Sequence, residues 1–252
     1  MFKESKFLQN SFVINFSRCT TIRRLANNFE DALKEKLSGH YSQPQVIPVP
    51  DELDPEVPRL IFTSIHGYSQ IIISQISLVF NVIYSPDWQI DISKGKDYLL
   101  ERSKVLFDLL LEVIPNIKIY FCGLTTRVRI PSKLKEEDLI SFLKTKFLKD
   151  TTITKDIYDI QLRTTKVIEK KFFSNITVQN YRAWEKMEPL IEIPRLSFDK
   201  VNEKGIEIIG DFNDRYAFNE NKSYYSTKEV SKEIIHKGIE IVLKVINYIL
   251  QG

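Results

Sequence analysis

The feature that most constrains this chain is its most apolar stretch, residues 234–250, because polar side chains interrupt it at regular intervals. These are His236, Lys237, Glu240, Lys244 and Asn247. Such periodic polarity predicts an amphipathic helix with one buried face, and charged side chains are costly inside lipid. We therefore predict that residues 227–250 form a long closing helix that covers a sheet, and that no segment of the chain spans a membrane.

The first half of the chain alternates between runs typical of strands and runs typical of helices. Apolar alternation predicts strands at 11–16, 59–64 and 116–130, and one long or two short strands at 69–84. Helical spacing predicts helices at 20–39 and from Ser93 to Pro115, with Gly39 as a natural stop. The resulting β-α-β-β-α-β order is typical of an antiparallel sheet with helices on one face.

The second half begins with a predicted helix at 136–148. Four predicted strands follow, at 157–165, 167–179, 195–201 and 205–212, and a polar loop at 219–226 precedes the closing helix. This gives the order α-β-β-β-β-α. We predict an α+β protein with two similarly built halves, residues 1–132 and 133–252, each an antiparallel sheet covered by helices.

Composition narrows the function classes. The 252 residues carry a formal net charge of only +3, which is far from the basicity of a dedicated nucleic-acid binder. Two cysteines are too few for a disulfide framework, and the amino terminus lacks the apolar core of a signal peptide, so we expect a cytoplasmic protein. Only eight glycines occur, and none form a phosphate-binding motif, so we expect no cofactor.

The histidines, His40, His66 and His236, show no metal-binding spacing. His40 and His66 are typical of surface turns, whereas His236 lies at helical spacing from Glu233 and Glu240 and could pair with them. We assign no catalytic residue among them.

Two acidic residues, Asp211 and Asp214, follow a predicted strand. Carboxylates at a strand end could hold Mg²⁺ for a hydrolase or nuclease. Asp and Asn are also ordinary residues of a turn that leaves a strand. We keep a metal-dependent hydrolase as an alternative, and we assign no residue to catalysis or to metal binding.

Basic residues interleaved with aromatic ones make a second candidate surface. Arg127 and Arg129 lie on one predicted strand, and Arg163, Lys166, Lys170 and Lys171 lie on or between the next ones. Basic and aromatic side chains together favour nucleic-acid contact. Alternation of charged and apolar residues is equally typical of any half-exposed strand.

Two further segments are candidates for contact with a partner. Residues 40–58 are rich in proline, including Pro48 and Pro50, and predict an irregular connection or an extended arm. Near the closing helix, Tyr216, Tyr224 and Tyr225 gather in a polar stretch, where aromatic residues favour recognition. The alternative is that these tyrosines cap the end of the sheet beneath the last helix.

Short motifs in the first half follow one another in a specific order. They are VPRLIF at 57–62, QIII at 70–73, LVFN at 78–81, YSPDW at 84–88, and GL with RIP between 123 and 131. This order resembles a sporadically distributed, functionally uncharacterised prokaryotic family with the pattern PRxxF…LQ…LxxN…YPxW…GLxxxxRIxIP, over roughly residues 10–135. The chain departs from it at 125–128, where the family has an aromatic residue and Asn. The resemblance implies an α+β fold and genes on mobile or defence-associated loci, and it carries over no catalytic residues.

Together these features favour binding over catalysis. We expect a non-enzymatic accessory subunit, in a prokaryotic antiviral defence complex, whose protein partner is encoded nearby. A nucleic-acid-binding protein, or a subunit of a nucleic-acid-guided effector, is the first alternative, and the metal-dependent hydrolase is the second.

Overall fold

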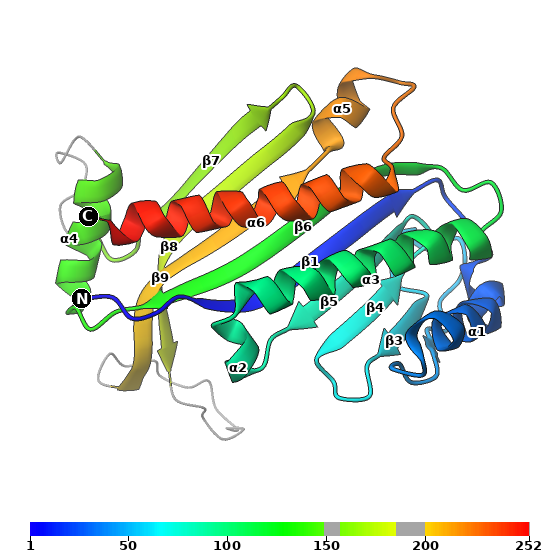
Figure 1. Cartoon of the computed structure of the whole chain (residues 1–252), viewed down its shortest axis with the longest axis horizontal. Coiled ribbons are helices and arrows are strands. Elements are labelled where there is room, and N and C mark those ends of the chain that lie inside the picture. Colours follow the sequence, from blue (N-terminus) through cyan, green and yellow to red (C-terminus); the bar gives the residue numbers. More distant parts are fainter. Residues whose placement is uncertain (149–156, 185–199, 252) are drawn as a thin grey trace.

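The computed structural model describes residues 1–148, 157–184 and 200–251, and its framework is one nine-stranded antiparallel sheet (Figure 1). The strands lie side by side in the order β2 (Gln45–Val46), β3 (Leu60–Thr63), β4 (Ser69–Ile73), β5 (Ser77–Ile83), β1 (Lys6–Phe16), β6 (Ile119–Pro131), β9 (Val201–Asn213), β8 (Phe172–Trp184) and β7 (Gln161–Ile168). The long strands β1 and β6 are therefore central neighbours. Strands from the first part of the chain lie beyond β1, and strands from the last part lie beyond β6.

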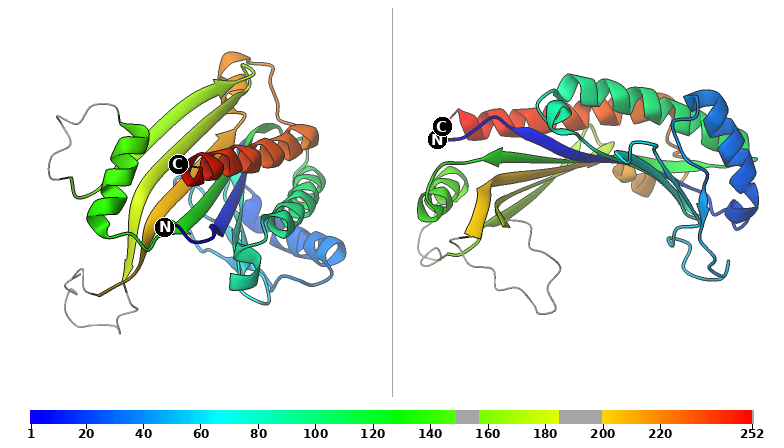
Figure 2. Two further views of the ribbon diagram at one scale, coloured as in Figure 1. Left: turned by 60° about the vertical axis from the view of Figure 1, so that its left-hand side comes forward. Right: turned by 90° about the horizontal axis from the view of Figure 1, so that it is seen from below.

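Two long helices, α3 (Ile92–Val113) and α6 (Lys228–Leu250), lie across the same face of the sheet (Figures 1 and 2). The shorter helices are α1 (Ala26–Leu37) after a 3-10 turn at Ile22–Leu25, α2 (Pro86–Gln89), α4 (Glu136–Phe147) and α5 (Arg215–Glu220). Side-chain caps define where the long helices begin. Asp91 accepts a hydrogen bond from the Lys94 amide at 3.2 Å, and Thr227 accepts one from the Val230 amide at 3.3 Å.

The core lies between the sheet and these two helices. From Asn10 to the end of β1 every second side chain is buried beneath the helices, including Phe12 and Ile14, while the alternate ones point to the other face. Helix α6 approaches the sheet closely at Gly210 of β9, where a Cβ atom would lie only 2.5 Å from Cγ2 of Val242. Glycine at this position therefore sets how deeply α6 is seated.

The prediction of a mixed α and β fold with antiparallel strands is confirmed, but the strands form one continuous sheet instead of one sheet per half. Strands β7 and β8 form a hairpin whose turn lies at Glu169 and Lys170, both with positive φ. The predicted strands 157–165 and 167–179 had placed the break between them at residue 166. No Gly or Asn marks this turn, which explains the error. The strand predicted at 195–201 lies almost wholly outside the described residues, and the loop predicted from 219 begins within α5.

Among the described residues, no helix combines the length and apolar character that crossing a bilayer requires. Cys19 and Cys122 are both free thiols, and Cys122 is fully buried in β6. Burial raises the pKa of the Cys122 thiol, so this cysteine is an internal packing residue and not an activated nucleophile.

Candidate interaction surface

The described helices α3 and α6 cover one face of the sheet and leave the opposite face largely uncovered (Figure 2). We call it the open face, and it consists of the side chains of β1 and β3 to β9 that point away from these two helices. Figure 2 shows that the sheet curves away from the helices at both ends, so the open face lies on the inside of the curve. Of the described helices, α5 packs on it, at one end, where Phe218 lies 5.6 Å from Phe121 and Tyr216 lies 5.3 Å from Phe173.

A row of polar side chains crosses the open face over eight strands. The strand registers place in this row Thr63, Gln70, Asn81, Ser11, Thr125, Asp211, Asn175 and Thr165. Part of the row is hydrogen-bonded internally: Thr165 donates to the Asn175 carbonyl oxygen at 2.8 Å, and the Asn175 amide donates to Asp211 at 2.9 Å. We call these eight residues the polar row.

Next to the polar row, four neighbouring strands, β1, β5, β4 and β3, carry an apolar row. It consists of Val13, Val79, Ile72 and Ile61, which are cross-strand neighbours and all half-buried. A sheet face with a polar and an apolar stripe side by side is typical of a surface that can be covered by a protein, because both hydrogen bonds and apolar burial are available.

Charges on the open face are nearly balanced. Arg129 donates to Glu207 at 2.9 Å, and Lys6 pairs with Glu203 at 2.7 Å. Arg127 and Arg163 are exposed and lie in one row, joined through β9 and β8 by their registers. They are separated by three strand spacings, roughly 14 Å.

The other predicted nucleic-acid contacts lie elsewhere. Lys166 pairs across strands with Ser174 on the helix side of the sheet, where it lines a groove beside Tyr248. Lys170 is exposed in the β7–β8 turn, and Lys171 forms an ion pair of 2.7 Å with Glu233 of α6. The structure thus brings together three of the six predicted basic residues, and Glu207 neutralises one of these three.

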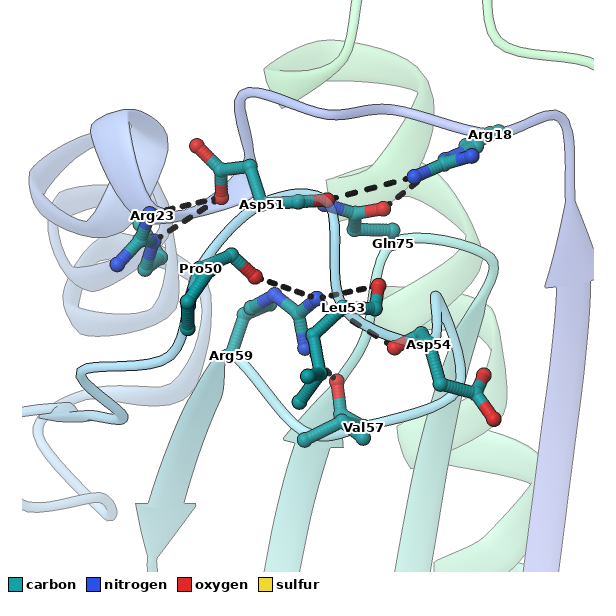
Figure 3. A network of polar contacts seen from close by, with 9 residues as sticks. All are labelled: Arg18, Arg23, Pro50, Asp51, Leu53, Asp54, Val57, Arg59 and Gln75. Carbon is teal, nitrogen blue, oxygen red and sulfur yellow. Dashed lines mark hydrogen bonds and ion pairs between the residues drawn. The ribbon is translucent and has the colours of Figure 1, made fainter.

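The proline-rich segment is anchored to the body of the protein by Arg59, whose side chain is fully buried (Figure 3). Its guanidinium donates to the carbonyl oxygen of Val57 at 2.6 Å, and to those of Pro50, Leu53 and Asp54 at 3.3–3.4 Å. Backbone carbonyls therefore solvate this buried cation, and the loop that supplies them is folded around it.

A second anchor of the same segment is Asp51, whose carboxylate pairs with Arg23 at 2.8 Å and whose carbonyl oxygen accepts from Gln75 at 2.9 Å (Figure 3). Pro48 and Pro50 remain exposed between these contacts. The segment is accordingly a fixed surface and not a free arm.

The predicted tyrosine cluster divides into three different environments. Tyr224 donates to Asp214 at 2.6 Å, Tyr216 packs edge-on against Phe173, and Tyr225 is exposed beside Lys118. Asp214 also accepts from the Cys122 amide at 2.6 Å. Tyr224 and Tyr216 thus hold the end of the sheet, and Tyr225 alone is exposed.

Of the candidate catalytic residues, His40 and His66 line one cavity together with Tyr41, whereas His236 lies on α6. His40, His66 and His236 are all exposed, and the Asp214 carboxylate is engaged by the two internal donors described above. Asp211 lies on the open face with Asn175 and Asn213 as donors. Within residues 1–148, 157–184 and 200–251, no three His, Cys, Asp or Glu side chains form a group that could hold a metal ion.

Comparison of the chain with models of known protein families finds no match, and comparison with curated protein sequences finds none. The class of protein therefore rests on the fold and the open face, which define an α+β protein with one sheet face available for binding. Sequence alternation identified outward-pointing residues such as Arg127, but neither the polar row nor the apolar row was recognised, because each is assembled by strand register.

Proposed function

We propose that this chain is a non-enzymatic binding subunit that docks a folded protein partner on its open face. The observation that carries the proposal is the face itself, because eight adjacent strands present polar and apolar rows that the described helices leave largely uncovered. Antiparallel sheets with one solvated face are common, but the exposed face then usually carries mainly charged and polar side chains. Here it includes a row of four aliphatic residues in adjacent strands.

The size of the open face supports a protein partner. Seven strand spacings of about 4.8 Å, and a depth of roughly 20 Å along the strands, give an area of roughly 700 Å². A stable protein complex buries about 800 Å² on each partner. The open face is therefore close to the size of one complete protein interface.

The charges of the open face favour protein over nucleic acid. Glu203 and Glu207 neutralise Lys6 and Arg129, and the carboxylate of Asp211 on the same face would repel phosphate groups. Arg127 and Arg163 are the specific observation in favour of the alternative, since both are exposed in one row. A nucleic-acid-binding protein is therefore kept as the second candidate function.

The biological setting of this proposal rests on the sequence resemblance described above. We propose a cytoplasmic accessory subunit of a prokaryotic antiviral defence complex, with the partner encoded nearby. The exposed Pro48, Pro50 and Tyr225 side chains are additional candidate contacts with that partner.

Substitution of Val79 by Arg tests the docking surface, because Val79 lies in the middle of the apolar row opposite Val13. We expect V79R to capture at least tenfold less partner protein than wild type from a lysate of the source organism. Mass spectrometry of the bound proteins measures the amount captured. The matched control is Leu111→Arg, which changes an equally apolar but exposed residue of α3 on the helix side. Equal capture by the two variants would contradict the proposal.

Two further measurements separate the alternative occupants. Light scattering of the purified chain reports whether a second copy occupies the open face. Fluorescence anisotropy with single-stranded and duplex DNA and RNA tests the nucleic-acid alternative. Binding that weakens with salt, and that is lost when Arg127 and Arg163 are both changed to Ala, would favour nucleic acid over protein.

We also propose that the chain consists of two similarly built halves. Support comes from the order of the main elements. When the two-residue strand β2, the 3-10 turn and the short helices α2 and α5 are left out, the order strand, helix, three strands, long helix occurs as β1-α1-β3-β4-β5-α3 and again as β6-α4-β7-β8-β9-α6. From the centre outward the strands run β1-β5-β4-β3 on one side and β6-β9-β8-β7 on the other. In this arrangement the boundary between repeats falls before β6, whereas the boundary expected from sequence, at residue 132, falls after it.

A further inference from the structure

A cavity of about 360 Å³ lies on the helix side of the sheet, among α2, the first turns of α3 and the ends of β4 and β5. In Figure 1 this region lies where α2 leads into α3. Five aromatic side chains line the cavity: Tyr41, Tyr68, Tyr84, Trp88 and Tyr98. Its volume and aromatic lining are those of a site for a small molecule.

The rings form walls at defined angles. Tyr84 and Trp88 are nearly parallel, with ring centres 6.4 Å apart and an interplanar angle of 19°, and Tyr98 meets Trp88 edge-on at 5.9 Å. Tyr41 and Tyr98 are joined through the Ser69 hydroxyl, at 3.0 Å and 3.3 Å. A flat ring can therefore contact aromatic surface on more than one side.

Arg102 brings a positive charge to this aromatic cavity. The residue is only 8% exposed, and its Nε has no hydrogen-bond partner within the described part of the chain. The nearest carboxylate, that of Glu101, is 3.8 Å away and its side chain is mostly exposed. The Tyr98 ring lies 5.1 Å from the guanidinium carbon. Burying a guanidinium without a close anion is costly, so the site is built for an anion that completes it.

Arg59 provides an internal comparison for Arg102. Both guanidinium groups are buried, but four backbone carbonyls surround that of Arg59, and the loop is folded around it. Within the described residues no such shell surrounds Arg102, which lines a cavity instead. Nε lacks a hydrogen-bond partner in both residues, so it is the difference in carbonyl contacts that identifies Arg59 as structural and Arg102 as available to a ligand.

We propose that the cavity binds a small aromatic acid, with its planar ring against the tyrosine and Trp88 side chains that line the cavity and its carboxylate or phosphate on Arg102. The flat fork of donors in arginine matches both anionic groups. Burial raises the pKa of Tyr84 to about 12 and also raises the pKa of Tyr41. Both hydroxyl groups therefore stay protonated at neutral pH and do not repel an anion. The site is independent of the proposed docking function, because it lies on the opposite side of the sheet.

Calorimetric titration of the whole chain tests this proposal with two matched pairs of probes. Indole-3-acetate is compared with indole-3-acetamide, and adenosine monophosphate with adenosine. We expect at least one acid to bind at least tenfold more tightly than its neutral partner. The pair that shows this difference tells whether the anionic group is a carboxylate or a phosphate. Equal affinity within both pairs, or no binding by either acid, would overturn the proposal.

Substitution of Arg102 by Met separates a ligand-binding role from a structural one. We expect R102M to weaken acid binding at least tenfold and to raise the Tm of the unliganded chain, because an uncompensated buried charge is removed. The matched control is Lys104→Gln, which removes a charge from the exposed side of the same helix. A lowered Tm or a failure to fold in R102M would show that Arg102 is structural.

Substitution of Trp88 by Leu tests the ring contact separately, since Trp88 is 37% exposed and its replacement leaves the core intact. We expect W88L to weaken the acid and its neutral partner by the same factor. Unchanged affinity for the acid would place the ring outside this cavity and overturn the proposal.

Discussion

At the residue scale, the surroundings of Asp214 disfavour the charged form of its carboxyl group. The residue is fully buried at the end of β9, and burial raises its pKa although Tyr224 and the Cys122 amide both donate to it. A carboxyl group with a raised pKa binds a proton more readily in the folded than in the unfolded chain. Its contribution to stability is therefore greatest in acid, and it declines as the pH rises through the pKa of the folded state.

Substitution of Asp214 by Asn tests this linkage. Asn can keep both hydrogen bonds, accepting from the Cys122 amide and donating to Tyr224, but it does not titrate. We expect the free energy of unfolding of wild type, minus that of D214N, to increase as the pH is lowered from about 7 to about 4, the ordinary pKa of an aspartate. Urea titrations at both pH values measure it. A difference that shrinks in acid would mean that the hydrogen bonds outweigh burial.

At the scale of elements, the contact between α6 and β9 depends on one glycine. A Cβ atom at Gly210 would meet Val242 at 2.5 Å, so Gly210→Ala pushes the helix outward. We expect G210A to cost about 1–3 kcal/mol of unfolding free energy and Val242→Ala to cost about 2 kcal/mol. The double variant should cost about 1 kcal/mol less than the two effects added together, because the smaller side chain makes room.

A double-mutant cycle in urea measures this coupling. The control pair combines Gly210→Ala with Ile249→Val, a buried residue two turns further along α6. Ile249 lies about 10 Å along the helix from Val242, the side chain that Gly210 faces, so these two changes should be additive. Equal coupling in both pairs would mean that α6 shifts as a whole and that Val242 makes no specific contact.

At the scale of the whole molecule, the continuous sheet couples the two ends of the chain. Strands β6 and β9 pair from Gly123 with Asn213 through to Pro131 with Gly205, across the boundary at residue 132 expected from sequence. Helices α3 and α6 also pack against each other over this junction. Separating the halves would expose both contacts, so we expect a single cooperative unfolding transition.

The two tryptophans report this cooperativity from opposite ends, Trp88 in α2 and Trp184 at the end of β8. We expect the single-tryptophan variants Trp88→Phe and Trp184→Phe to show fluorescence transitions at the same urea concentration, after correction for the stability of each variant. Circular dichroism of both variants provides the common reference. Two separate midpoints would show that the halves unfold as independent domains.

Much of the local structure was predictable because it depends on neighbouring residues. The predicted helix at 136–148 and the closing helix at 227–250 agree with α4 and α6 to within one residue, since acidic first turns and caps are local signals. The hairpin turn was misplaced because Glu169 and Lys170 adopt positive φ without the residues that usually announce it. The buried Arg59 appeared in the sequence only as part of a motif, and its role became clear only when the loop just before it was seen to fold back and supply four carbonyl oxygens.

The sequence by itself determined the types of element, their order and the buried side of each, because periodicity and capping act over a few residues. Only the tertiary structure decided that all nine strands join one sheet and that one face stays open. It also decided which side chains from distant segments meet, such as Tyr41 with Ser69 and Val13 with Val79. The physical reason is register: shifting a strand by one residue exchanges its two faces, and pairings between distant segments set that register.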